Sequence, residues 1–137
     1  MKAALFVGGW EGHAPTHFAD WYRDLLESNG FVVDVYHTLE PLERPSELAD
    51  LNLITPIWSS ARSGHQEEFG NMTKLQEDGL LQLIANGCGL AGWQGHMCDA
   101  FRGCPTYHPS LIHALRSSRP PLIYTAACPQ HHQHYAP

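Results

Sequence analysis

Two histidines stand in glycine-containing turns of this sequence, and they are its best candidates for acid–base chemistry. His13 follows the first apolar run, and His96 lies in a second turn that begins near Gly92. A neutral imidazole can accept a proton or hydrogen-bond a hydroxyl group near neutral pH. We therefore predict His13 and His96 as catalytic residues. The competing interpretation is that His13 only caps or orients its own loop.

Three tryptophans could form the walls of a ligand site. Trp10, Trp58 and Trp93 each follow or end a predicted strand, so in a parallel sheet all three would come near one edge. An indole face can stack on the C–H face of a sugar ring while its N–H stays free for a partner. We predict all three as substrate-binding residues. Aromatic residues at strand ends also pack under helices, which is the alternative.

Glycines and one acidic residue complete the candidate set. Gly8, Gly9 and Gly95 allow positive φ angles and a close approach of ligand to backbone amides, although turn geometry alone also explains them. Glu11 could orient either histidine, whereas a loop glutamate is usually only solvated. We assign these four residues to substrate binding.

The composition argues against several classes of function. With 14 acidic against 8 basic residues, the chain lacks the basic footprint of a nucleic-acid binder. No stretch approaches the roughly 18 apolar residues of a membrane span, and the start does not resemble a signal peptide, so we expect a cytoplasmic protein with no membrane partner. The four cysteines form no C-x-x-C pair and the first glycine turn lacks the G-x-G-x-x-G spacing. We therefore expect no metal and no cofactor.

The fold that positions these residues is predicted from the sequence pattern, in which short apolar runs alternate with stretches of helical periodicity. The runs typical of strands are residues 3–7, 31–36, 51–58 and 88–93. The stretches with helical spacing are residues 15–28, 46–50, about 66–85, and the segment from the 92–96 turn to about Phe101. This order predicts an α/β fold with an open, mostly parallel sheet and helices on both faces. Ligands of such sheets sit outside the carboxyl ends of the strands.

The composition changes abruptly after Gly103. All 14 acidic residues lie at or before Asp99 and all 12 glycines at or before Gly103, whereas residues 104–137 hold most of the prolines and half of the histidines. We expect an α/β domain over residues 1–103 and a disordered or loosely attached segment over 104–137. The alternative is a structured segment with a helical turn at 111–115 and a strand at 121–127.

Four stretches together resemble the ThuA-like (trehalose-utilisation) family. They are Gly8-Gly9-Trp10-Glu11-Gly12-His13-Ala14-Pro15, Thr55-Pro56-Ile57-Trp58, Asn86-Gly87-Cys88-Gly89-Leu90-Ala91-Gly92-Trp93 and Asp99-Ala100-Phe101-Arg102. The resemblance covers about residues 2–103. It implies a flavodoxin-like fold similar to class I glutamine amidotransferases, a sugar-like small-molecule ligand, and a role in carbohydrate metabolism.

The resemblance also implies a role for Gln94. In the amidotransferase relatives, a G-x-C-x-G elbow presents a nucleophilic thiol, and residues 92–96 match that elbow with Gln94 in the nucleophile's place. A side-chain amide is too weakly basic to attack a carbonyl at neutral pH, so thiol-dependent amidotransfer is not expected. We group Gln94 with His13 and His96 as catalytic candidates. The ThuA-like family usually carries histidine at the position of Gln94 and glycine at that of His96, so this chain departs from the family pattern.

The leading hypothesis is a ThuA-like protein that binds a sugar or polyol, with its reaction unspecified. The alternatives are a non-catalytic binding or interaction domain and an inactive, truncated fragment. Nothing after Gly103 matches the family's remaining strands, so we expect the domain to be incomplete at its carboxyl end. An unpaired sheet edge would follow, which a homo-oligomer could cover.

Overall fold

Four parallel strands form the centre of the molecule. The computed structural model describes residues 1–59, 71–93, 95–98, 100, 101, 103, 104, 106 and 107. The strands are β1 (Lys2–Gly9), β2 (Val32–Tyr36), β3 (Leu53–Ser59) and β4 (Gly89–Leu90). They pair in the order β2-β1-β3-β4, all parallel, as the first four strands of a flavodoxin-like sheet do. The predicted open α/β sheet is thus confirmed.

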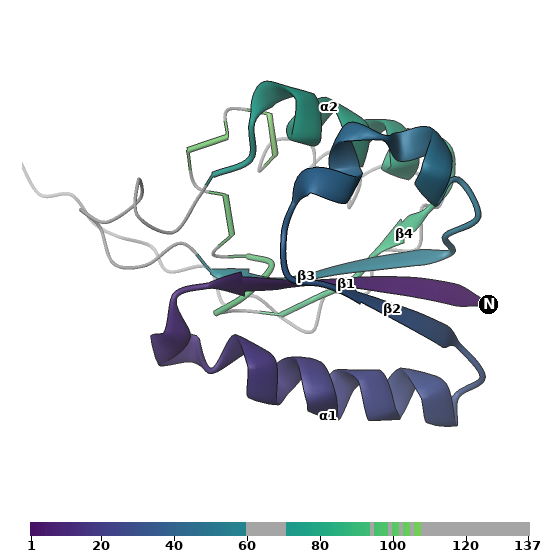
Figure 1. The fold of residues 1–137 in the computed structure, drawn as a ribbon, viewed down its shortest axis with the longest axis vertical. Helices are drawn as coiled ribbons and strands as arrows, with labels where there is room; N and C mark the ends of the chain where they lie inside the picture. Colours follow the sequence, from purple (N-terminus) through teal and green to yellow (C-terminus); the bar gives the residue numbers. More distant parts are fainter. Residues whose placement is uncertain (60–70, 94, 99, 102, 105, 108–137) are drawn as a thin grey trace, which may run out of the picture.

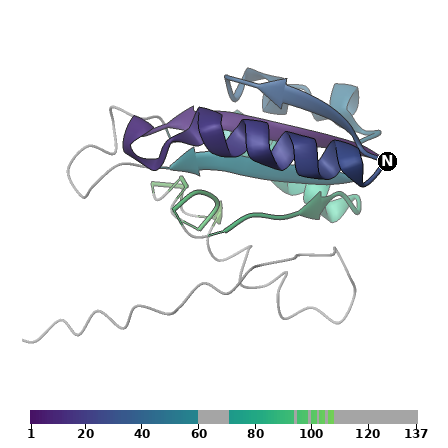
Figure 2. The ribbon, with the colours of Figure 1, turned by 90° about the horizontal axis from the view of Figure 1, so that it is seen from below.

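Helices cover both faces of this sheet. Helix α1 (Pro15–Ser28) lies along one face, and helix α2 (Lys74–Ala85) lies on the other (Figure 1). Two short 3-10 helices, Glu40–Glu43 and Pro45–Leu48, pack beside α2. Figure 2 looks onto the α1 face, where the helix runs along the sheet. No helix within the described ranges is both long and apolar enough to cross a membrane.

Local sequence explains the two long helices. Helix α1 begins at Pro15, whose fixed φ suits the first helical position, and it ends at Asn29 before Gly30 turns the chain with a φ of +82°. Helix α2 begins later than residue 66, where its spacing predicted it. Thr73 forms a capping box with Gln76, each side chain bonding the other's backbone N–H, and this sets the start at Lys74. Residues 66–70 lie outside the described residues.

The alternation of side chains along the strands divides the core into two layers. Ala3, Leu5 and Val7 of β1 pack with Ile57 of β3 on the side of α1. The intervening residues face the other side and pack among the residues of α2 and the 3-10 helices. They are Ala4, Phe6, Ile54 and Trp58. Because β1 contributes side chains to both layers, shifting its pairing register by one residue would move each side chain to the opposite face of the sheet.

The chain after β3 and β4 differs from the prediction in two places. Strand β4 has two residues instead of the expected six, because its pairing with β3 is limited to Leu53 with Gly89 and Ile54 with Leu90. The helix expected to end near Phe101 is also wrong for residues 95–98, which form turns. The Trp93 carbonyl accepts from both His96 N (3.3 Å) and Cys98 N (3.5 Å), a pattern that no regular helix has.

The packed core continues past Gly103. Cys104 and Tyr107 are buried, and the Tyr107 hydroxyl donates to the Met97 carbonyl at 3.1 Å. Thr106 N donates to Oε1 of the buried Glu77 at 3.1 Å. The described core therefore extends beyond the boundary expected from composition. The helical turn and strand considered at 111–115 and 121–127 lie outside the described residues.

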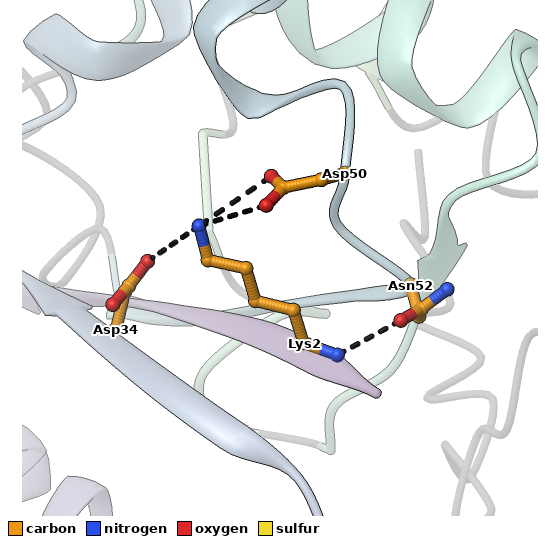
Figure 3. Close-up of polar contacts among 4 residues, drawn as sticks. All are labelled: Lys2, Asp34, Asp50 and Asn52. Carbon is orange, nitrogen blue, oxygen red and sulfur yellow. Dashed lines mark hydrogen bonds and ion pairs between the residues drawn. The ribbon is translucent and has the colours of Figure 1, made fainter.

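An ion-pair cluster ties the chain together at the amino ends of the strands (Figure 3). Lys2 Nζ lies 3.2 Å from Asp34 Oδ2 and 3.1 Å from Asp50 Oδ2, while Lys2 N donates to Asn52 Oδ1 at 2.8 Å. Hydrogen bonds to Asp50 and Asp34 raise the pKa of the Lys2 ammonium. The cluster links β1 and β2 with the chain entering β3, at the end of the sheet opposite the predicted ligand site.

Candidate functional site

The carboxyl ends of β1 and β4 bring together the two predicted histidines. Strand β1 runs into Trp10 and a 3-10 helix, Glu11–His13, which leads directly to α1. His96 comes from the turn that follows β4. The ring centroids of His13 and His96 lie 6.0 Å apart in an edge-to-face arrangement. The structure thus brings together two segments that are far apart in the chain.

Two of the three tryptophans extend this pair into a row of rings. The Trp10 and His13 centroids are 4.8 Å apart, and the Trp93 and His96 centroids are 5.1 Å apart. The order along the row is Trp10, His13, His96, Trp93. Both indoles are partly exposed. The row thus places two imidazoles between two aromatic walls.

Trp58 stands apart from this row. It is 9% exposed and belongs to the core layer on the α2 side, where its ring lies 6.1 Å from that of Phe101. Trp93 packs against the layer on the α1 side. All three indoles stand toward the carboxyl ends of the strands, but Trp58 and Trp93 are on opposite faces of the sheet. Trp58 and Trp93 therefore do not share a face, because the pleat of β3 turns Trp58 to the α2 side.

Helix α1 supplies aromatic neighbours that the sequence analysis did not single out. The Phe18 ring lies 5.1 Å from the His96 ring and 6.0 Å from the Trp93 ring, and Trp21 lies 6.2 Å from Trp93. Phe18 is 38% exposed and Trp21 55% exposed. Their spacing of three residues puts both on one side of the helix, a pattern that by itself fits packing onto the sheet equally well.

Packing requirements explain two of the predicted glycines. A Cβ at Gly8 would lie 2.6 Å from the Trp58 ring. One at Gly9, whose φ is +85°, would lie 2.3 Å from the Ser59 carbonyl oxygen. Gly95 is different, because a Cβ there would meet only the His13 ring, at 3.8 Å. Gly8 and Gly9 hold β1 tightly against β3, and Gly95 borders the imidazole of His13.

Three buried polar atoms lack a hydrogen-bond partner among the described residues, and two of them, in His13 and Ser59, lie at the carboxyl ends of the strands. Within the described part of the chain, His13 Nδ1, Thr55 Oγ1 and Ser59 Oγ are buried and form no hydrogen bond. Most buried polar atoms in folded proteins are hydrogen-bonded, so each such exception asks for an explanation. His13 Nδ1 therefore has hydrogen-bonding capacity that no described residue uses.

The remaining candidates contribute less to the described geometry. Glu11 is exposed, and its carboxylate makes no hydrogen bond or ion pair with a described residue. Gln94, predicted at the elbow, lies outside the described residues. No contact among the described residues therefore supports the orienting role considered for Glu11.

Two of the three described cysteines, Cys88 and Cys104, are buried thiols. Burial raises the pKa of the Cys88 thiol to about 11, and burial also raises that of Cys104, so both stay protonated near neutral pH. No three histidine, cysteine or acidic side chains of this part of the chain lie together as ligands of one metal ion would.

A separate cleft of about 580 Å³ lies at the other end of the α1 face. Its lining is mostly apolar and includes Met1, Tyr22, Leu25 and Phe31. These residues come from the amino ends of β1 and β2 and from the second half of α1. The cleft is therefore distinct from the row of imidazoles and indoles.

No protein-family model, no curated protein and no solved structure matches this chain in the comparisons made with it.

Proposed function

We propose that this chain is a ThuA-like protein that binds a sugar or polyol at the carboxyl ends of β1 and β4. The observation that carries the proposal is the row of rings, in which His13 and His96 lie 6.0 Å apart between the indoles of Trp10 and Trp93. The resemblance of residues 2–103 to the ThuA-like family supports it independently. In parallel α/β sheets, ligands bind at this edge.

The chemistry of the row fits a polyhydroxy ligand. The indole faces of Trp10 and Trp93 offer apolar surface to the C–H face of a sugar ring. Between them, the buried and unpartnered Nδ1 of His13 can hydrogen-bond a hydroxyl group, which would satisfy the imidazole on binding. A neutral imidazole beside a bound hydroxyl can also act as a general base, in a reaction that needs no thiol.

Titration of the purified chain with glucose, trehalose and glycerol tests this proposal. A ligand that binds the native state raises the melting temperature, and calorimetry then gives the dissociation constant. Replacing His13 by alanine removes one ligand hydrogen bond, so affinity should fall about two- to tenfold. His37→Ala is the matched control, because His37 is exposed and has no ring contact among the described residues.

Two outcomes would contradict the proposal. One is a cooperatively unfolding chain whose melting temperature none of these compounds raises. The other is equal loss of affinity in His13→Ala and His37→Ala, which would show that the ring row does not hold the ligand. If a sugar binds and is recovered unchanged after long incubation, the site acts as a binding site without turnover.

A further inference from the structure

The hydroxyl of Ser59 is a polar group at this edge that the proposed sugar site does not use. Ser59 is the last residue of β3, it has 0% exposure, and its Oγ forms no hydrogen bond with any described residue. Its backbone is engaged, since its carbonyl accepts from Trp10 N at 3.0 Å. Ser59 therefore lies beside the turn that leads from β1 to α1.

The pleat of β3 directs this hydroxyl toward α1. Leu53 and Ile57 pack in the layer on the α1 side, whereas Ile54 and Trp58 pack in the opposite layer. Side chains two residues apart along a strand share a face, so Ser59 shares the face of Ile57. Because α1 begins at the carboxyl end of the sheet, the Ser59 side chain points to the side where the helix starts.

The start of α1 carries partial positive charge that its own N-cap and first turn do not neutralise. The helix has 14 residues, its N-cap Ala14 makes no side-chain cap, and its first turn contains no acidic residue. The first N–H groups of a helix lack intrahelical partners, and the helix dipole places partial positive charge there. In α1, these groups include the N–H groups of Thr16 and His17, since Pro15 has none.

Both candidate imidazoles border the same helix start. His13 stands two residues before Pro15, the first residue of α1, and the ring of Phe18, in the first turn, lies 5.1 Å from that of His96. A buried hydroxyl donor, the first N–H groups of a helix and two imidazoles thus come from three segments of the chain. Such donors favour an anion over a neutral hydroxyl group.

We propose that Ser59, the first turn of α1 and the imidazoles of His13 and His96 form a subsite for an anionic group of the ligand. The inference rests on the proposed sugar site and narrows its ligand to a sugar or polyol that bears a carboxylate or a phosphoryl group. The Ser59 hydroxyl donates to an anionic oxygen, and the N–H groups of Thr16 and His17 bind the same group at the helix end.

Glucose, gluconate and glucose 6-phosphate test the subsite, because they share a carbon chain and differ in charged group. We expect at least one of the two anions to bind about tenfold or more tightly than glucose, with saturable amide NMR shifts at Thr16 and His17. The tighter anion identifies a carboxylate or a phosphoryl group as the natural one. Equal affinity of all three compounds would overturn the inference and leave the sugar site intact.

Two variants separate the subsite from the sugar site. Ser59→Ala should weaken binding of the preferred anion roughly three- to tenfold and leave glucose binding unchanged. Thr16→Asp places a carboxylate at the exposed start of α1, which suits the helix dipole but repels an anionic ligand. It should weaken the preferred anion about tenfold or more while the fold stays intact.

The matched control is Thr38→Asp, which adds the same charge at an exposed position after β2. This control should leave the affinity for the anion nearly unchanged. If Ser59→Ala fails to fold, Thr16→Asp decides the question, because Thr16 is exposed. If Thr16→Asp and Thr38→Asp reduce the affinity for the anion equally, the subsite is refuted, because the loss then comes from the change in net charge.

Discussion

Replacing Gly9 by alanine should weaken the junction of β1 and β3 that supports the whole ligand edge. Gly9 has a φ of +85°, and an added Cβ would lie 2.3 Å from the Ser59 carbonyl oxygen and 2.8 Å from Ser59 N. A non-glycine residue at positive φ costs about 1–2 kcal/mol. Moving the β3 backbone away from the new Cβ would weaken a hydrogen bond, because the Ser59 carbonyl accepts from Trp10 N.

The magnitude follows from these two contributions. Loss of the Trp10–Ser59 hydrogen bond adds about 0.5–1.5 kcal/mol to the backbone strain, so Gly9→Ala should lower the free energy of unfolding by about 1.5–3.5 kcal/mol. Gly30→Ala provides the matched control. Gly30 has nearly the same φ, +82°, but an added Cβ there meets nothing within 4 Å. This control should cost only the strain, about 1–2 kcal/mol.

Urea unfolding followed by circular dichroism measures both free energies, provided that the slopes with denaturant agree. The difference between the free energies of unfolding of the two variants gives the cost of crowding Ser59, where β1 and β3 approach closely. If Gly9→Ala and Gly30→Ala lose the same stability, the contact does not constrain residue 9 and the argument for tight packing at this edge is wrong.

Two further predictions concern buried groups outside the ligand edge. Glu77→Ala should lower the free energy of unfolding by about 1–3 kcal/mol, because it removes the hydrogen bond from Thr106 N to the buried Glu77 carboxylate. The exposed Glu47→Ala should cost less than about 1 kcal/mol in the same urea titration. Burial raises the pKa of the Cys88 thiol from 9.0 to about 11, so the free energy of unfolding should fall as pH rises between these values. Cys88→Ala should reduce that fall. If the variant keeps the same dependence on pH, Cys88 is not the group that causes it.

The strands and the first helix were predictable because their signals are local. The apolar run 3–7 lies within β1, and Pro15 with the Asn29-Gly30 stop bounds α1. The boundaries of α2 and β4 were less accurate. The hydrophobic periodicity predicted a start for α2 near residue 66, whereas the capping box at Thr73 sets it at Lys74. The length of β4 depends on how many of its residues pair with β3.

The sequence by itself determined the parallel α/β architecture and the sheet edge where His13 and His96 would meet, because hydrophobic periodicity and the direction of parallel strands follow from residue order. Only the tertiary structure decided that Trp58 faces away from Trp93 and that Phe18 reaches His96. It also showed that the buried Ser59 hydroxyl lacks a partner. Alternation along a strand tells which residues share a face, but the helix that covers each face, and the contacts a side chain makes there, arise from packing between segments distant in the chain.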